Sequence, residues 1–412
     1  MNPTMIRKHG PNYRWYVLAI TMIIYGLVTG AARLCMPVLF KQISDDLGLS
    51  MVEIGTIWGM DPLAGIFIGL PGGLLADRFG VRRTLTIVCI LAGIFGALRG
   101  LSVNFISMAA TMFLFGLMAA AAPSVVPKMT ADWFGGRGLG MANAMLNIAW
   151  AIGAMVATMF SATVFSPIFG SWRWVMLLYG VPAVLLGILC YATVRDPDES
   201  DISKGKNKLL DTPAVKVPFR EAISRVVRMK EVWVIGLIMT ANWGAGMGLI
   251  GYLPLYLRNI GWTPASADTV ITVFNGFSSL GVIPMVLLSD KIRSRKAVVV
   301  ISIVSTVLSI GLLPLVNTTG VWALIIACGF LRSGASALFN VMIFEIKGIG
   351  ATYGGTAIGL ANTISMVGAF LAPPLGNSLA DINQGYPFYF WAFLAALSLP
   401  MLFFIKNRTG QS

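Results

Sequence analysis

The dominant feature of this sequence is a series of twelve apolar runs, each about 20 residues long or longer. A hydrocarbon core about 30 Å thick is crossed by about 20 apolar residues in a helix. Only 11% of the 412 residues are charged, whereas soluble domains carry about 25%. An ordinary soluble enzyme is therefore excluded. We predict an all-α membrane protein with transmembrane helices at residues 15–40, 52–76, 84–105, 107–127, 138–165, 172–194, 232–257, 266–288, 297–316, 320–343, 354–375 and 386–405.

One interruption is longer and more polar than the others. Residues 195–230 separate the sixth run from the seventh, and they begin with Arg-Asp-Pro-Asp-Glu. We interpret this segment as a linker between two groups of six helices. The predicted divisions are an N-terminal half at 1–194, the linker at 195–230 and a C-terminal half at 231–412.

The basic residues indicate how the helices are oriented. If the N-terminus, the even-numbered loops, the linker and the C-terminus share one side, that side holds 24 of the 30 lysines and arginines. Basic loops face the cytoplasm. We therefore expect a multi-pass protein of the plasma membrane (the inner membrane of a bacterium) with both termini cytoplasmic. The formal charge of +13 then reflects topology and not a nucleic-acid partner, and we expect a monomer in the lipid bilayer.

The reactive residue types exclude several other classes of function. Neither a disulfide nor a zinc site is expected, because the single histidine, His9, lies in the polar N-terminal tail and the cysteines lack paired spacing. No sequence matches the phosphate-binding motif G-x-x-x-x-G-K-[ST]. We expect no metal, no cofactor and no direct use of ATP, so transport would be passive or ion-coupled. The four cysteines, all in apolar runs, are Cys35, Cys89, Cys190 and Cys328.

The two halves of the chain resemble each other at nearly constant offsets. Each match alone is weak, but their shared order indicates a duplicated six-helix unit. Parallel six-helix halves with a site at their interface are one architecture of secondary transporters. The matching segments are 140–143 with 359–362 at offset 219, 36–41 with 253–258 at offset 217, and 75–78 with 288–291 at offset 213.

The loop after the second run carries a recognisable motif. It reads Gly73-Leu-Leu-Ala-Asp77-Arg78-Phe-Gly80-Val-Arg82-Arg83, which resembles the signature of the major facilitator superfamily, G-x-L-a-D-r-x-G-r-k. The resemblance implies twelve transmembrane helices in two pseudo-symmetric bundles around a central cavity. It also implies a gating role for Gly73, Asp77, Arg78, Gly80 and Arg82.

The chemistry of this loop suits a gate. Gly80 permits a tight turn with positive φ, and Asp77 can accept hydrogen bonds from a helix N-terminus or an arginine. The sequence departs from the signature at Val81, where a basic residue is usual. The second-half copy is degenerate, with Arg293 at the position of Gly80.

Four charged residues lie well inside predicted spans. Insertion of each costs about 2.5–3.5 kcal/mol, so such residues are functional candidates. At 1.5 Å per residue, Arg33, Asp61 and Arg99 lie roughly 9–13 Å below the outer surface, and Arg332 lies close to the midplane. Two interpretations of Asp61 remain open: a structural ion pair with Arg99, or a proton carrier.

The resemblance implies that the first and fourth helices of each half line the cavity. Arg33 and Arg332 lie on such helices, and the sequence shows no obvious acidic partner for either. Two such guanidinium groups would form a receptor for a carboxylate or similar oxyanion. Arg33 could instead extend outward to the polar surface. Other candidate contacts are Tyr25, Asn147, Trp150, Trp243, Tyr252, Tyr256, Asn275, Asn340 and Asn362, for each of which helix packing is the competing interpretation.

These features favour a secondary transporter of a small anionic solute, such as a carboxylate, coupled to protons or to a counter-anion. No enzyme is expected, because the spans hold no catalytic cluster. Two alternatives remain: proton-coupled drug efflux, and a transporter-like sensor that does not transport. The fifth span lacks the G-x-x-x-G-P-x-x-G-G pattern of drug/proton antiporters, which disfavours the first.

Overall fold

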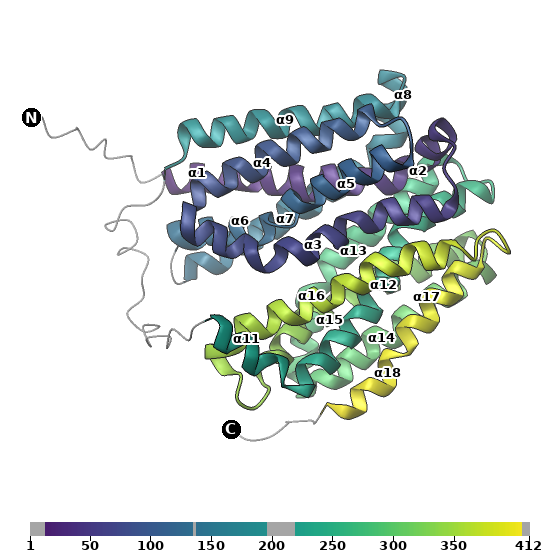
Figure 1. Cartoon of the computed structure of the whole chain (residues 1–412). Coiled ribbons are helices and arrows are strands. Elements are labelled where there is room, and N and C mark those ends of the chain that lie inside the picture. Colours follow the sequence, from purple (N-terminus) through teal and green to yellow (C-terminus); the bar gives the residue numbers. More distant parts are fainter. Residues whose placement is uncertain (1–12, 135–136, 196–218, 406–412) are drawn as a thin grey trace, which may run out of the picture.

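The computed structural model describes residues 13–134, 137–195 and 219–405, without the side chains of residues 69–77, 137, 219–220 and 351–352 (Figure 1). Twelve helices in these residues are long and apolar enough to cross a membrane. The predicted number of spans is therefore confirmed.

The N-terminal half contains six spans, several of which are composite. The first consists of α1 (Tyr13–Ile24), the π-helical segment η1 (Tyr25–Ala31) and α2 (Ala32–Leu47). The others are α3 (Met51–Phe79), α4 (Val81–Leu98) with η2 (Arg99–Leu101), α5 (Phe105–Ala119) with α6 (Ala122–Trp133), α7 (Arg137–Phe160) with η3 (Ser161–Phe165) and α8 (Ser166–Phe169), and α9 (Trp172–Thr193).

The short helix α11 (Phe219–Val227) precedes the C-terminal half, which then repeats the six-span pattern. Its spans are α12 (Lys230–Asn259), α13 (Pro264–Ile292), α14 (Arg295–Leu312) with η4 (Leu313–Leu315), α15 (Thr318–Phe344), α16 (Gly350–Asn377), and α17 (Tyr386–Ala396) with α18 (Ser398–Met401) and η5 (Leu402–Phe404).

Polar residues in the short loops set where the helices start and stop. Ser50 and Glu53 form a capping box at the start of α3, and Asn104 and Ser107 form one at the start of α5. Such caps satisfy the amide groups that the first helical turn leaves unpaired. Gly48, with φ of 64°, ends α2. These loops fix the order of adjacent antiparallel spans.

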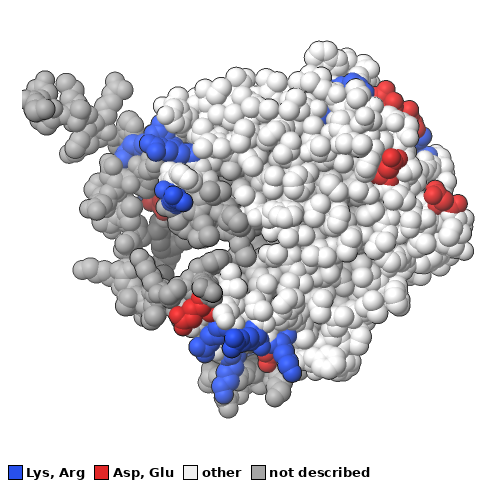
Figure 2. All heavy atoms as spheres, in the orientation of Figure 1, with Lys and Arg blue, Asp and Glu red and all other residues white. Residues whose placement is uncertain are grey.

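The two halves lie one above the other in Figure 1 and diverge toward one end. We call this the linker end, since α1 starts, α9 ends and α11 starts there; the opposite end is the far end. Figure 2 shows a hollow between the halves near the linker end. Toward the far end the halves touch: an ideal Cβ on Gly55 of α3 would lie 2.8 Å from backbone atoms of Pro373 and Pro374 in α16.

A positive φ angle recurs at one equivalent turn of the two halves. Gly80, which ends α3, has φ of 85°, in agreement with the predicted tight turn. Arg293, at the equivalent place after α13, has φ of 54° and is the one non-glycine residue with positive φ among the described residues. The ψ angles differ, since ψ is 148° at Gly80 and 29° at Arg293, so only the second-half turn is in the left-handed α conformation. A side chain in that conformation costs about 1–2 kcal/mol.

Replacing Arg293 with glycine should therefore raise the free energy of unfolding by about 1 kcal/mol. Thermal unfolding of the purified protein in detergent measures the change. The control is Lys291→Gly in the last turn of α13, which should lower stability by about 1 kcal/mol because glycine disfavours helix. Equal destabilisation by both substitutions would contradict strain at Arg293.

Candidate functional site

The first two spans bring Arg33 and Asp61 together. Arg33 on α2 and Asp61 on α3 form a direct ion pair, with 30% of the arginine side chain exposed and 2% of the aspartate. The arginine thus shields the carboxylate and is itself reachable by solvent or solute. The absence of an acidic partner for Arg33, expected from the sequence, is wrong.

A π-helical segment places Arg33. Segment η1 ends two residues before Arg33, and such wide turns are frequent at functional sites. It packs tightly on α7: an ideal Cβ on Gly153 would lie 2.0 Å from the carbonyl oxygen of Gly26, and one on Gly30 would lie 2.7 Å from that of Trp150. Only glycine permits this approach of the two backbones.

Arg99 has a different set of partners from the one expected. Its Nη2 donates to the carbonyl oxygen of Ala32 at 2.8 Å, and its Nε donates to that of Gly96 at 3.1 Å. Its guanidinium also lies 4.2 Å from the ring centroid of Phe115. The predicted Arg99–Asp61 ion pair is wrong, because Asp61 pairs with Arg33. Carbonyl oxygens and an aromatic face hold this fully buried charge without an acid.

Arg332 is held by backbone and not by an acid. Its Nη2 donates to the carbonyl oxygen of Asn242 on α12 at 3.1 Å, and its buried Nε has no hydrogen-bond partner. The guanidinium lies over Gly246, where an ideal Cβ would be 2.1 Å from Nη2. Among the described residues no carboxylate pairs with Arg332, and the residue as a whole is half-buried.

These charges lie just below a closure between the two halves. Trp58 on α3 donates its indole N–H to the carbonyl oxygen of Met247 on α12 at 2.9 Å. Asp61 follows Trp58 by three residues and Asn242 precedes Met247 by five. At 1.5 Å per residue, both positions lie about 5–8 Å nearer the linker end than this bond. The Arg33–Asp61 pair and Arg332 therefore occupy neighbouring levels on opposite halves.

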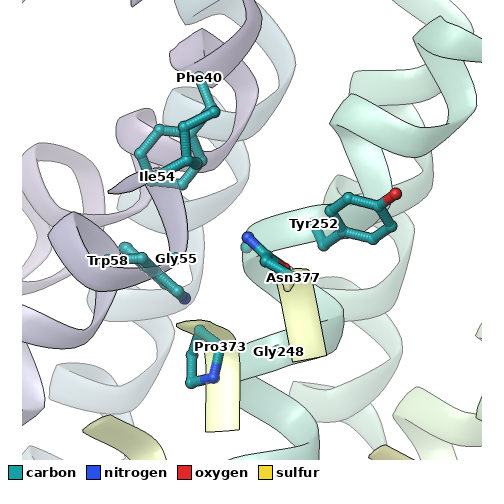
Figure 3. Close-up of a pocket in the computed structure, with 9 residues that line it drawn as sticks. Phe40, Ile54, Gly55, Trp58, Gly248, Tyr252, Pro373 and Asn377 are labelled. Atoms are coloured by element: carbon teal, nitrogen blue, oxygen red, sulfur yellow. The ribbon is translucent and has the colours of Figure 1, made fainter. Parts of the chain in front are cut away.

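The closure itself is tightly packed. Figure 3 shows Trp58 and Gly55 opposite Gly248, Tyr252 and the residues of α16, and the space between them has no room for a water molecule. An ideal Cβ on Gly251 would lie 2.6 Å from the Trp58 ring. Asn377 on α16 also donates to the carbonyl oxygen of Met51 on α3 at 2.9 Å. The far end is thus closed at this point.

The other predicted contacts separate into two groups. Asn275 on α13 is 3% exposed, and its buried Nδ2 has no partner; Asn340 on α15 has a buried, unpartnered Oδ1. Both retain unused hydrogen-bonding capacity. Partly or largely exposed candidates are Tyr25, Asn147, Trp150, Trp243 and Asn362, of which Asn147 bonds the carbonyl oxygen of Asn143.

Two tyrosines belong to packing at the far end. Tyr256 lies 4.9 Å from the ring of Phe388, and Tyr252 donates to the carbonyl oxygen of Gln384 at 3.0 Å. Both are less than 10% exposed. The prediction that Tyr256 contacts substrate is therefore corrected, since its ring fills an aromatic cluster of the C-terminal half.

The gating motif is described only in part. Arg82 bonds the carbonyl oxygen of Tyr191 and lies 4.8 Å from its ring centroid. Arg78 lies over the ring of Phe79. Gly73 and the side chain of Asp77 lie outside the described part, so their predicted gating role stays a prediction.

A second buried ion pair was not predicted. Arg258 Nη2 at the end of α12 lies 2.5 Å from Asp268 Oδ1 at the start of α13. Asp268 was inside the predicted span 266–288, but so close to its edge that it resembled a loop residue. The available signal was an acid and a base ten residues apart across the turn at Gly261.

The fold and these paired charges define a membrane transporter of two six-helix halves. The profile of the Major Facilitator Superfamily matches residues 18–346 and 242–412. The chain belongs to this superfamily, as its motif suggested.

Individual relatives are more distant. The chain is 22% identical to a hexuronate transporter of Bacillus subtilis, over 95% of this chain and 94% of that protein. It is 24% identical to a cis,cis-muconate transport protein of Acinetobacter baylyi, over 96% of each. A probable galactarate/D-glucarate transporter of B. subtilis matches at 26% identity, but over only 41% of its own length. In structure, a bacterial homologue of the human lysosomal transporter Spinster, inward-facing and unoccupied, superposes with a TM-score of 0.80 at 17% identity, over 96% of this chain and 98% of that one.

The contact between η1 and α7 generates a stability prediction. Gly153→Ala should lower the free energy of unfolding by about 1–3 kcal/mol, because the added methyl group forces the two backbones apart. Thermal unfolding in detergent measures the loss.

Gly140→Ala is the matched control on the same helix. Nothing lies within 4 Å of an ideal Cβ there, so this substitution should stabilise the protein by about 0.5–1 kcal/mol through helix propensity. If Gly153→Ala were equally harmless, the position of Arg33 would not depend on this contact.

Proposed function

We propose that this protein is a secondary transporter that carries a small carboxylate-bearing anion across the membrane by alternating access. The observation that carries the proposal is Arg332, a half-buried residue deep in a span whose guanidinium has no acidic partner among the described residues. A permanent charge at that depth is costly unless a ligand or water compensates it. A carboxylate can accept two parallel hydrogen bonds from a guanidinium.

The relatives support an anionic solute. Hexuronate and cis,cis-muconate, named for two full-length relatives, both carry carboxylate groups. A cationic drug would meet an uncompensated positive charge at Arg332, which disfavours the drug-efflux alternative. Asn275 and Asn340, with their unused polar atoms, supply hydrogen bonds that suit a solute with hydroxyl or further carboxylate oxygens.

We also propose that the linker end is cytoplasmic and that the membrane is the plasma membrane, the inner one in a bacterium. The support is the excess of basic residues on that side. The division into residues 1–194, 195–230 and 231–412, and action as a monomer, belong to the same proposal. On this orientation the structure has its cytoplasmic end open and its outer end closed.

The Arg33–Asp61 pair suggests how transport is coupled. While Asp61 is charged it occupies Arg33, and the pair is electrically neutral. A proton on Asp61 would release the guanidinium to a substrate carboxylate. We therefore propose proton–anion symport with Asp61 as the proton carrier; exchange of one anion for another is the alternative that the experiments below distinguish.

Substitution of Arg332 tests the receptor. Arg332→Gln should abolish transport in proteoliposomes while the protein still folds, because the glutamine removes a costly charge. Arg332→Lys should raise KM about 10- to 100-fold, since it keeps the charge but loses the planar pair of donors. Flux of labelled hexuronate and muconate against external concentration gives both quantities.

Gly246→Ala is the companion variant, since it keeps the arginine but pushes the guanidinium off its contact with α12. It should raise KM with little change in the amount of folded protein. Normal transport by Arg332→Gln would refute the receptor. Tight binding of a carboxylate without any flux in the unmodified protein would favour the sensor alternative.

Substitution of Asp61 tests the coupling. Asp61→Asn should lose accumulation driven by a proton gradient and retain exchange of substrate across the membrane, because the amide cannot carry a proton. The measurements are uptake with and without an inward proton gradient, and counterflow at equal pH.

Asp61→Glu is the control, since it keeps a titratable acid beside Arg33 and should retain some gradient-driven uptake. Full gradient-driven accumulation by Asp61→Asn would exclude Asp61 as the carrier. Loss of counterflow as well would assign the residue to folding or binding and not to coupling.

A further inference from the structure

The Arg258–Asp268 pair is buried more deeply than its position near a helix end requires. The side chains are 8% and 0% exposed, and the paired atoms are 2.5 Å apart. Arg258 Nε and Asp268 Oδ2 are both buried without a hydrogen-bond partner. The ion pair is therefore monodentate, and each side chain has a polar atom that is buried from water without a hydrogen bond. Such a pair gains less from its contact than full desolvation costs.

The opposite half of the protein packs against the helices that carry this pair. Thr272 lies one turn after Asp268 on α13 and shares a hydrogen bond of 2.9 Å between hydroxyl groups with Thr158 of α7. Residues four apart on a helix share a face, so Asp268 faces the N-terminal half. Segment η3, which follows α7 toward the far end, packs on α13. Closure of the far end thus places parts of the N-terminal half against the helix on which Asp268 is buried.

We propose that the Arg258–Asp268 pair is a conformational device that keeps closure of the far end reversible. When the halves separate there, water reaches both side chains and satisfies the atoms that closure leaves unpartnered. The pair therefore favours the open far end and opposes a permanently closed one. This proposal rests on alternating access, but not on the identity of the solute.

Single and double variants of the pair should shift the opening of the far end in opposite directions. Asp268→Asn or Arg258→Gln leaves one polar or charged group buried without its partner, which penalises the closed form further. The double variant Arg258→Met with Asp268→Leu removes both desolvation costs and fills the space with apolar atoms. The single variants should open the far end, and the double variant should close it.

A reporter cysteine measures the opening directly. Ile54 is 1% exposed and lines the closure between the halves shown in Figure 3, on the α3–α16 side and away from the pair. The four native cysteines are buried, so Ile54→Cys supplies the reactive thiol. The purified full-length chain in detergent is labelled with a water-soluble maleimide, and the labelling of the unmodified chain is subtracted.

We expect either single variant to label about tenfold faster than the reporter alone, and the double variant about fivefold slower. The matched control is Asp45→Asn, which breaks the pair of Lys41 and Asp45; Lys41 is the repeat equivalent of Arg258, but this pair is 42% and 60% exposed. It should change the rate by less than about twofold, since exposed pairs contribute little.

Labelling of the folded single variants at the reporter's own rate would overturn the proposal, as would faster labelling of the double variant. Size-exclusion chromatography establishes folding, and if the single variants misfold the double variant alone decides the result. Because no substrate is added, this outcome is independent of whether the solute carries a carboxylate. Slower transport by the double variant would be the functional counterpart.

Discussion

Within the span of a membrane no water is available to solvate a charge, so each guanidinium needs partners from the protein. The structure meets this requirement in three ways. Arg33 and Arg258 each contact a carboxylate, Arg99 uses carbonyl oxygens and an aromatic ring, and Arg332 has a single carbonyl oxygen. The four guanidinium groups differ in how many of their hydrogen-bond donors have partners. The fully enclosed Arg99 uses its bonding capacity within the protein, whereas the incompletely bonded Arg332 is the group that we propose as the receptor for a ligand.

Close approach of backbones makes these arrangements possible. The glycines of η1 and α7 bring two helices of the N-terminal half together beside Arg33, and Gly55 brings α3 against α16 across the halves. In a membrane, where apolar surface gains little by leaving lipid, packing of small residues supplies much of the association energy. The same type of contact therefore holds each half together and closes the far end. The charges occupy levels fixed by these contacts.

The sequence alone was sufficient for the helices and the overall fold. Apolar runs and the motif from Gly73 to Arg82 are local patterns, so they can be recognised in the sequence without knowledge of the structure. Pairing depends on the direction in which each side chain leaves its helix. Counting residues placed Arg33, Asp61 and Arg99 at one level, but it could not show that Asp61 faces Arg33, because the π-helical turn shifts the helical phase. Asp268 was missed for a different reason: it lies near the edge of its predicted span, where the sequence does not distinguish a buried acid from a loop residue.

The π-helical segment η1 has a consequence for how this chain tolerates changes of length. One residue of an α-helix corresponds to a rotation of about 100° and a rise of 1.5 Å. A single-residue deletion within η1 that restored regular α-helix would turn all of α2 by about that angle relative to α1. Arg33 would leave Asp61, and the glycine contacts with α7 would lose their register. This one internal turn therefore fixes how α2 is rotated relative to α1.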